Sequence, residues 1–195
     1  MKKYAAIVLA AGASKRLGKP KQLLPYKDST LLNHCIQELL NLESVDVYVV
    51  LGAYADAILL TVHKLKVTTI LNEDWDKGMG TSLSAGITGI KKQGSYDGVI
   101  VSLSDLPYIN TEHYKKLIQA FEKGNGLTVT SYPNFKGVPC MIGSQYFSEL
   151  KGLTGDEGAK PLMKKYEKEV SKVTSETSYF DVDTDESYQK LVNLS

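Results

Sequence analysis

The sequence has only two cysteines and no long apolar run, which argues against two broad classes of protein. Cys35 and Cys140 are far apart and fall in different expected elements, so we interpret them as small core residues of a reduced protein rather than a disulfide. No apolar run is long enough to cross a bilayer, so we expect no membrane partner. The short N-terminal apolar stretch ends in a loop of glycine and lysine, which argues against a signal peptide. We therefore expect a cytoplasmic protein.

The chain also lacks an excess of charge of either sign. It carries 23 Lys and Arg residues against 22 Asp and Glu residues, a formal net charge of +1. A general nucleic-acid-binding protein is strongly basic, so we expect no nucleic-acid partner. The three histidines and two cysteines form no pattern typical of a Ser-His-Asp set, a Cys-His pair or a zinc site. The expected chemistry therefore needs no protein nucleophile.

The length and pattern of the chain predict one α/β domain spanning residues 1–195. With 195 residues, 43% of them hydrophobic, and no linker or repeat, a single core is the default. Strands are expected at 4–10, 46–51, 67–71, 98–103, 127–131, 138–142 and 178–182. Helices are expected after Ser29 or Thr30 and over 54–64, 81–91, 111–123, 144–151, 157–167 and 184–193. Continuously apolar strands that alternate with helices predict a three-layer α/β/α sandwich with a mostly parallel sheet.

A basic, glycine-containing loop follows the first expected strand and is the most informative segment of the chain. Residues 9–21 read LAAGASKRLGKPK and place four cations, Lys15, Arg16, Lys19 and Lys21, within seven positions. Small residues let backbone N–H groups approach a ligand closely, so a strand that ends in such a loop is suited to hold a polyphosphate. A solvated basic turn is the alternative.

Neither of the two commonest phosphate-binding loops explains this segment. A Walker A loop has four residues between its glycines, and then Lys followed by Ser or Thr. Here five residues separate Gly12 from Gly18, and Lys19 is followed by Pro20. The G-x-G-x-x-G fingerprint of dinucleotide-binding folds is also absent after this strand.

Residues 9–21 do resemble the signature L-A-A-G-x-S-x-R-M-G-x-x-K of the MobA-like nucleotidyltransferases, most closely the branch that makes molybdopterin cytosine dinucleotide. Leu17 stands where the signature usually has Met, and every other position matches. The resemblance covers residue 4 to about residue 190 and implies a Rossmann-like nucleotide-diphospho-sugar transferase fold. It implies that the nucleotide is bound by Leu9, Ala10, Ala11, Gly12, Ser14, Arg16, Gly18 and Lys21. Arg16 and Lys21 would also be catalytic, by neutralising the triphosphate.

A second glycine-containing segment, residues 72–87, resembles the family's N-x-x-W-x-x-G-M-x-x-S-L-x-x-G stretch. Its hydroxyl side chains stand at the start of an expected helix, whose free N–H groups favour an anion or a base carbonyl. The resemblance implies that Gly80 and Ser82 bind the nucleotide and that Ser82 reads the base. Ordinary helix capping by Thr81 or Ser82 is the alternative.

The expected strand 98–103 leads into Asp105 and Pro107, which puts a carboxylate at the carboxyl edge of the sheet. Ligands of such sheets bind at this edge, and Mg²⁺ prefers carboxylate oxygens. The segment resembles the family's A-D-Q-P or G-D-x-P, with Leu106 in place of the usual Gln. The resemblance implies that Asp105 binds nucleotide and Mg²⁺ and is catalytic. A capping role for Asp105 in the following turn is the alternative.

Residues 180–186, FDVDTDE, resemble the D-[IV]-D-T-x-E-D sequence that closes many nucleotidyltransferase domains. In a short strand, Asp181 and Asp183 would share one face. The resemblance implies that Asp183 is the second metal ligand beside Asp105. Thr184 is expected to cap the final helix.

Two later stretches resemble the acceptor half of the family's site. Residues 136–143 are similar to its G-x-P strand, and residues 152–160 to its G-D-x-G-A-R helix start. The resemblance implies acceptor contacts from Gly137, Pro139, Asp156 and Lys160. The cytidylyltransferase branch often has His and Arg at the positions of Val138 and Lys160. Lysine keeps the charge but loses bidentate geometry, so the acceptor's identity stays open.

The resemblance implies a Mg²⁺-dependent enzyme that moves a nucleoside monophosphate from an NTP to a phosphate acceptor and releases pyrophosphate. Ala11, in L-A-A-G rather than the L-A-G-G of the guanosine branch, favours CTP, and the favoured acceptor is molybdopterin. Transient contact with a molybdoenzyme or its chaperone is also expected. The alternatives are a GTP-dependent molybdopterin guanylyltransferase and a sugar-phosphate or alditol-phosphate nucleotidyltransferase. Two further alternatives come from other classes of protein: a dinucleotide-binding oxidoreductase and a non-catalytic nucleotide-binding cofactor chaperone.

Overall fold

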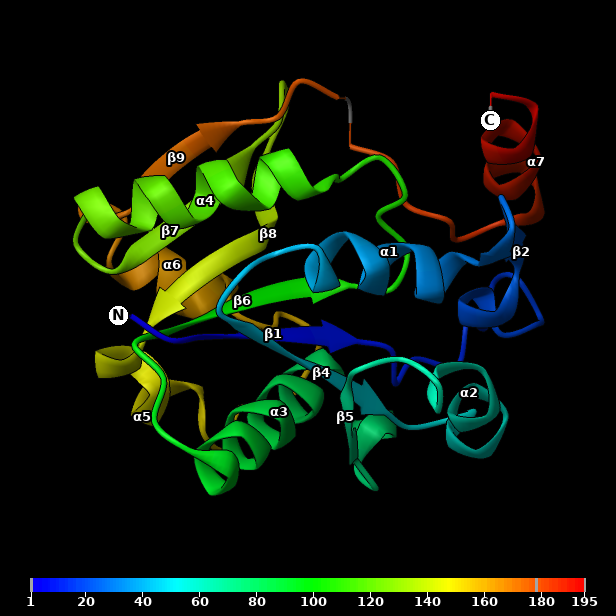
Figure 1. The fold of residues 1–195 in the computed structure, drawn as a ribbon, viewed down its shortest axis with the longest axis horizontal. Coiled ribbons are helices and arrows are strands. Elements are labelled where there is room, and N and C mark those ends of the chain that lie inside the picture. The colour runs from blue at the N-terminus through cyan, green and yellow to red at the C-terminus, as the bar shows by residue number, and fades with distance from the viewer. Residues whose placement is uncertain (1, 178, 195) are drawn as a thin grey trace.

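In the computed structural model, which describes residues 2–177 and 179–194, a seven-stranded sheet lies between two layers of helices (Figure 1). The strand order is β5-β4-β1-β6-β8-β7-β9. The strands are β1 (Tyr4–Leu9), β4 (Val45–Leu51), β5 (Thr68–Leu71), β6 (Gly98–Leu103), β7 (Leu127–Ser131), β8 (Lys136–Gly143) and β9 (Ser171–Thr174). Strand β8 pairs antiparallel with β6 and β7, and the other pairings are parallel. The expected α/β sandwich with a mostly parallel sheet is confirmed.

Helices cover both faces of the sheet (Figure 1). One face packs against α1 (Leu31–Leu40), α2 (Ala55–Val62) and α4 (Thr111–Lys123). The opposite face packs against α3 (Met79–Gln93), α5 (Phe147–Leu150) and α6 (Lys160–Lys165). Short 3-10 helices lie at η1 (Lys21–Leu23), η2 (Trp75–Lys77) and η3 (Ser144–Tyr146), and a small hairpin joins β2 (Pro25–Tyr26) to β3 (Ser29–Thr30).

Strand β1 is buried on both sides because its side chains alternate between two cores. Ala6 and Val8 belong to the core under α1 and α4, whereas Ala5 and Ile7 belong to the core over α3. Leu9, at the end of β1, is in register with Val50 of β4 and Leu103 of β6. The loops that follow these three strands therefore begin at the same edge of the sheet.

A third, smaller core ties the C-terminal segment to the N-terminal loop. It consists of Leu17, Leu24, Tyr26, Leu31, Val182 and Leu191. Helix α7 (Asp185–Asn193) accordingly lies beside β2 (Figure 1). Thr184 caps α7, as expected, by accepting a hydrogen bond from the Ser187 backbone N–H at 3.2 Å.

Most expected elements are present; the hairpin of β2 and β3 was not expected, and the other errors fall near the C-terminus. The bounds expected for α4 and β7 agree with the structure, and Thr30 caps α1 by accepting from the Asn33 backbone N–H. The expected strand at 178–182 is wrong over 179–182, which forms no strand, and residue 178 lies outside the described part of the chain. Strand β9, which was not expected, occupies the sheet edge instead.

Cys35 and Cys140 are buried and unpaired, as expected of small core residues. Within residues 2–177 and 179–194, no helix is both long and apolar enough to cross a lipid bilayer.

Candidate active site

The loop after β1 and the turn after β6 meet through an ion pair between Lys21 and Asp105. Lys21 Nζ donates to Asp105 Oδ2, and it also donates to Asp183 Oδ1 at 2.8 Å. The Asp105 side chain is only 3% exposed and the Lys21 side chain 18%. Asp105 and Asp183, which follow Lys21 by 84 and 162 positions in the sequence, thus bind the same ammonium group.

Asp183 also forms an ion pair with a second cation of the same loop, Arg16. Arg16 Nη2 donates to Asp183 Oδ2 at 2.6 Å, although the Arg16 side chain is 75% exposed. Three carboxylates, those of Asp105, Asp181 and Asp183, bring oxygen atoms within 4.8 Å of one another. Oxygen donors in such a group suit a hard divalent cation. Asp181 was not predicted as a ligand from the sequence, although it was expected on the same strand face as Asp183.

The charges of this cluster are coupled through Lys21. Burial raises the pKa of Asp105, against the effect of the adjacent Lys21 ammonium. Burial also disfavours the charge of Lys21, but the two carboxylates outweigh it and raise the pKa of Lys21, which stays cationic at neutral pH. Partial burial opposes ionisation of Asp183, but the Lys21 hydrogen bond and the charges of Lys21 and Arg16 lower the pKa of Asp183.

Gln22, which the sequence analysis missed, fixes the shape of the basic loop. Gln22 is 1% exposed, and its Nε2 donates to the carbonyl oxygens of Ala10 at 2.9 Å and Gly12 at 3.0 Å. The Lys21 backbone N–H donates to Ser14 Oγ at 3.2 Å, which closes the loop a second time. The sequence carries no signal for this role, because the partners of the Gln22 amide are backbone carbonyls.

The space beside Gly12 is open. A Cβ atom built at Gly12 would meet no protein atom within 4 Å, and its φ is not in the left-handed region. By contrast, a Cβ at Gly52 would lie 2.6 Å from Trp75 Cβ, so packing explains that glycine. The protein's own fold does not require glycine at position 12, and the open space leaves room for a ligand against the backbone.

A cavity of about 300 Å³ lies at this edge of the sheet. Of the residues expected to bind nucleotide, it is lined by Leu9, Ala11, Gly12, Lys21, Ser82 and Asp105. It is also lined by Lys15, Gln22, Trp75, Asp76 and Ser104, which were not expected. Ala10, Ser14 and Gly18 shape the loop rather than line the cavity: Ala10 and Ser14 accept the hydrogen bonds described above, and Gly18 adopts φ 70°.

The start of α3 positions Ser82 in this cavity. Gly78 is the helix N-cap, without a side-chain capping bond, so capping by Thr81 or Ser82 is wrong. The buried Asn72 donates from Nδ2 to Thr81 Oγ1 and Ser82 Oγ, both at 3.0 Å. Asn72 therefore fixes the Ser82 hydroxyl, and Ser82 is one of the residues that line the cavity.

Gly80 contacts a neighbouring loop rather than the cavity. Its backbone N–H donates to the Gly155 carbonyl oxygen at 2.8 Å, and a Cβ at Gly80 would lie 2.6 Å from the Thr154 carbonyl oxygen. This close approach fixes the loop before α6 against the start of α3.

A second cavity, of about 380 Å³, adjoins the first and shares Met79, Leu103 and Asp156 with it. It is lined by three of the four residues expected to contact the acceptor: Gly137, Asp156 and Lys160. The fourth, Pro139, is buried in β8, where its carbonyl oxygen accepts from Thr130 Oγ1 at 2.6 Å.

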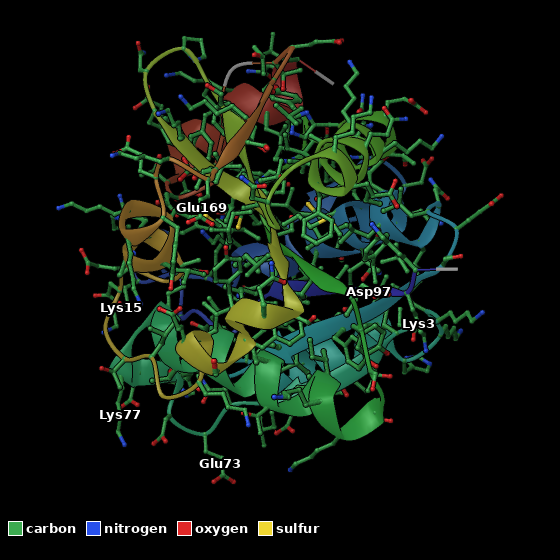
Figure 2. The ribbon with its side chains drawn as sticks, turned by 90° about the vertical axis from the view of Figure 1, so that its left-hand side faces the viewer. Lys3, Lys15, Glu73, Lys77, Asp97 and Glu169 are labelled. Carbon is green, nitrogen blue, oxygen red and sulfur yellow. The ribbon has the colours of Figure 1, made fainter. Side chains whose placement is uncertain are left out.

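Both cavities lie toward the carboxyl edge of β1 and β6. Figure 2 shows Lys15 and Lys77 on one side of the molecule and Lys3 and Asp97 on the opposite side. Lys3 and Asp97 precede β1 and β6, whereas Lys15 follows β1 and Lys77 precedes α3. This placement agrees with the rule that such sheets bind ligands beyond the carboxyl ends of their strands.

Comparison with known proteins identifies the family. Residues 6–170 match the model of the MobA-like NTP transferase domain. The chain belongs to the MobA-like NTP transferase family, and thus to the nucleotidyltransferases. The match covers the basic loop, Asp105 and the segment before α6, and it ends before Asp181 and Asp183.

Curated relatives of the MobA-like chain carry several different names. It is 28% identical to Nicotine blue oxidoreductase of Paenarthrobacter nicotinovorans, over 95% of both chains. It is 29% identical to Purine catabolism protein PucB of Bacillus subtilis, over 81% of this chain and 79% of that one. It is 23% identical to Molybdenum cofactor cytidylyltransferase of Escherichia coli, over 70% and 71%.

Solved structures support the same fold. A homologue of Mycobacterium tuberculosis Rv0371c, from Mycobacterium sp. strain JC1, is 30% identical, with a TM-score of 0.86 over 98% of both chains. The manganese complex of Rv0371c from Mycobacterium tuberculosis H37Rv is 23% identical, with a TM-score of 0.83 over 98% of both chains.

Proposed function

We propose that this protein is a divalent-metal-dependent nucleotidyltransferase that transfers a nucleoside monophosphate from CTP to the phosphate of a molybdopterin-type acceptor. The observation that carries the proposal is the convergence of Asp105, Asp181 and Asp183 with Lys21 at the end of the signature loop. Carboxylates and cations together in one cleft suit a substrate with several phosphates and its metal ion.

The three carboxylates offer the oxygen donors that Mg²⁺ and Mn²⁺ prefer, and Asp105 is held at the buried end of the group. Mg²⁺ is the proposed ion, and the manganese complex of a protein with this fold supports a divalent cation. Such an ion supplies charge neutralisation and Lewis acidity at the phosphates. Lys21 and Arg16, which pair with the same carboxylates, would contact the triphosphate oxygens when nucleotide is bound.

The proposed reaction is an in-line displacement at the α-phosphorus. An oxygen of the acceptor phosphate forms the new bond to the α-phosphorus, the bond to the bridging β-phosphate oxygen breaks, and pyrophosphate leaves. A phosphate monoester has its second pKa near about 6, so the attacking group is already ionised at neutral pH. No general base is then needed, and the residues act by positioning and by stabilising negative charge.

CTP is favoured over GTP by Ala11, which lines the first cavity within the L-A-A-G sequence. The relatives include the cytidylyltransferase named above and also a probable molybdenum cofactor guanylyltransferase of Bacillus mycoides, which is 31% identical over 119 residues. Sequence identity to these relatives therefore does not distinguish a cytosine nucleotide from a guanine nucleotide as the substrate. The product would pass to a molybdoenzyme or its chaperone in the cytoplasm.

Thermal unfolding with CTP, GTP, ATP and UTP, each with and without Mg²⁺, tests the nucleotide. A ligand at about 100 times its Kd stabilises a fold by about 2.7 kcal/mol, which raises the Tm by a few degrees. We expect a Mg²⁺-dependent shift with CTP. Competition of CTP against GTP for pyrophosphate release with molybdopterin then tests the reaction, and better use of GTP would overturn the choice of CTP.

A second candidate is a dinucleotide-binding oxidoreductase, because the 28% identical Paenarthrobacter relative is named an oxidoreductase. The sequence has no G-x-G-x-x-G after β1, and Leu83 stands where the third glycine would follow Gly78 and Gly80. Adding NADH and NADPH to the same thermal panel separates the two. A shift with either dinucleotide and none with any NTP would favour the oxidoreductase.

A further inference from the structure

The second cavity has an apolar floor and a basic rim. Its floor contains Val129, Val138, Cys140, Met163 and Val170, all buried or half-buried. Its rim contains four exposed lysines, Lys136, Lys160, Lys164 and Lys172. The floor suits an apolar body, and the rim suits negative charge.

Two of these lysines converge because of the strand register. Lys136 of β8 pairs with Ser131 of β7, and Lys172 of β9 pairs with Val129 of β7. Val129 and Ser131 are two residues apart, so their side chains point to the same face of the sheet, and the two lysines reach that face from either side of β7. Lys136 is close enough to lower the pKa of Lys172, because two ammonium groups repel each other.

No carboxylate within residues 2–177 and 179–194 forms an ion pair with Lys136 or Lys172. Asp156, Glu157 and Glu167 also line the cavity, but the effect of Glu167 on Lys172 ranks below that of Lys136. Outside the cavity, Lys165 of the adjoining α6 does have a partner, Glu149 Oε2 at 2.6 Å. The two convergent ammonium groups are left for an external anion.

We propose that Lys136 and Lys172 bind an anionic group on the acceptor, whose apolar body lies on the cavity floor. This inference rests on the proposed function and specifies the acceptor's chemistry. The two lysines meet over β7, which is two strand spacings, or roughly 10 Å, from β6. The group that they hold is therefore separate from the phosphate that reacts beside Asp105.

Binding of 1-naphthyl phosphate and of its neutral counterpart 1-naphthol, followed by probe fluorescence with the full chain, tests the lysine pair. We expect the protein to bind the phosphate about tenfold more tightly than the alcohol. The double variant Lys136→Gln, Lys172→Gln should bind both probes alike. The matched control Lys115→Gln, Lys123→Gln removes two exposed lysines of α4 and should keep the tenfold preference.

An unchanged preference in the Lys136→Gln, Lys172→Gln variant would overturn the inference, as would equal binding of the two probes to the unaltered protein. Loss of the preference in a Lys15→Gln variant would place the probe in the first cavity, which Lys15 lines, and would also overturn it. Failure of the proposed function has a different signature. In that case no NTP would raise the Tm or release pyrophosphate, while the lysine-dependent preference between the probes would persist.

Discussion

The Lys21 ammonium contacts the Asp105 carboxylate, which joins the loop after β1 to the turn after β6. The carboxylate is almost completely buried, and its nearest cation comes from a residue that the signature loop itself presents. The two side chains thus hold each other in place, and Asp183, which lies near the C-terminus, also forms an ion pair with Lys21.

Asp105→Asn should lower the rate of nucleotidyl transfer about 100-fold or more. The change keeps the shape of the side chain but removes the negative charge that would bind the proposed metal ion, and loss of one electrostatic group of this kind costs roughly that much. Steady-state pyrophosphate release measures the effect, and circular dichroism checks that the variant is folded. Turnover near that of the unaltered enzyme would remove Asp105 from the mechanism.

Gly12→Ala should leave the Tm within about a degree of the original but weaken CTP binding at least tenfold. A methyl group at position 12 meets no protein atom, so any penalty must come from the ligand that approaches the loop. Gly52→Ala is the matched comparison, because its methyl group would collide with Trp75 and should lower the Tm. Equal CTP affinity in Gly12→Ala and the unaltered protein would show that nucleotide does not occupy this space.

Leu191→Ala should destabilise the protein by about 2–5 kcal/mol, the usual cost of truncating a buried leucine. The third core holds the C-terminal segment against the signature loop, so Mn²⁺ binding should weaken as well, because Asp181 and Asp183 lie in that segment. Urea unfolding and Mn²⁺ titration measure the two effects. Leu194→Ala is the control, since Leu194 is 75% exposed and its loss should change neither.

Asp183→Asn should lower stability at neutral pH and have no such effect in acid. Lys21 and Arg16 lower the pKa of Asp183 below its unfolded value of 3.8, so its contribution is present above that value and is lost as the pH falls through the folded pKa. Urea unfolding at pH 6, 4 and 3 should show the difference between the two proteins shrinking. A difference that stays constant down to pH 3 would contradict an ionic role for Asp183.

Asp185→Asn is the control for this pH series. Asp185 makes an exposed ion pair with Lys19, at 2.8 Å, and such surface pairs contribute little to stability. We therefore expect the unfolding free energy of the Asp185→Asn variant to equal that of the unaltered protein at pH 6, 4 and 3.

The sequence predicts the buried half of the fold well because continuous apolar runs specify strands covered on both faces. It fails for β9, where Val173 is the only buried residue among Ser171–Thr174, so a sheet edge leaves almost no apolar pattern. The same weakness explains the wrong strand at 178–182. There Tyr179 and Phe180 look apolar enough for a strand, but they pack as loop side chains against Tyr132 and Tyr108.

At the candidate site, the signature positions predicted Lys21, Asp105 and Asp183, and the structure brings these three together. The sequence could not show that Lys21 pairs with both carboxylates, because the contacts span 84 and 162 positions and depend on the register of the sheet. Gln22 was missed for a different reason. Its role is to hold backbone carbonyls, and backbone partners leave no mark on the residue types around them.

The two cavities share part of their lining, and this affects how the product would be released. Met79, Leu103 and Asp156 line both spaces, so a product in which nucleotide and acceptor are joined would lie across both at once. Such a product would compete with each substrate for binding and would have to leave both cavities in one step. We expect product inhibition against either substrate, and a catalytic cycle whose slowest step is release rather than bond formation.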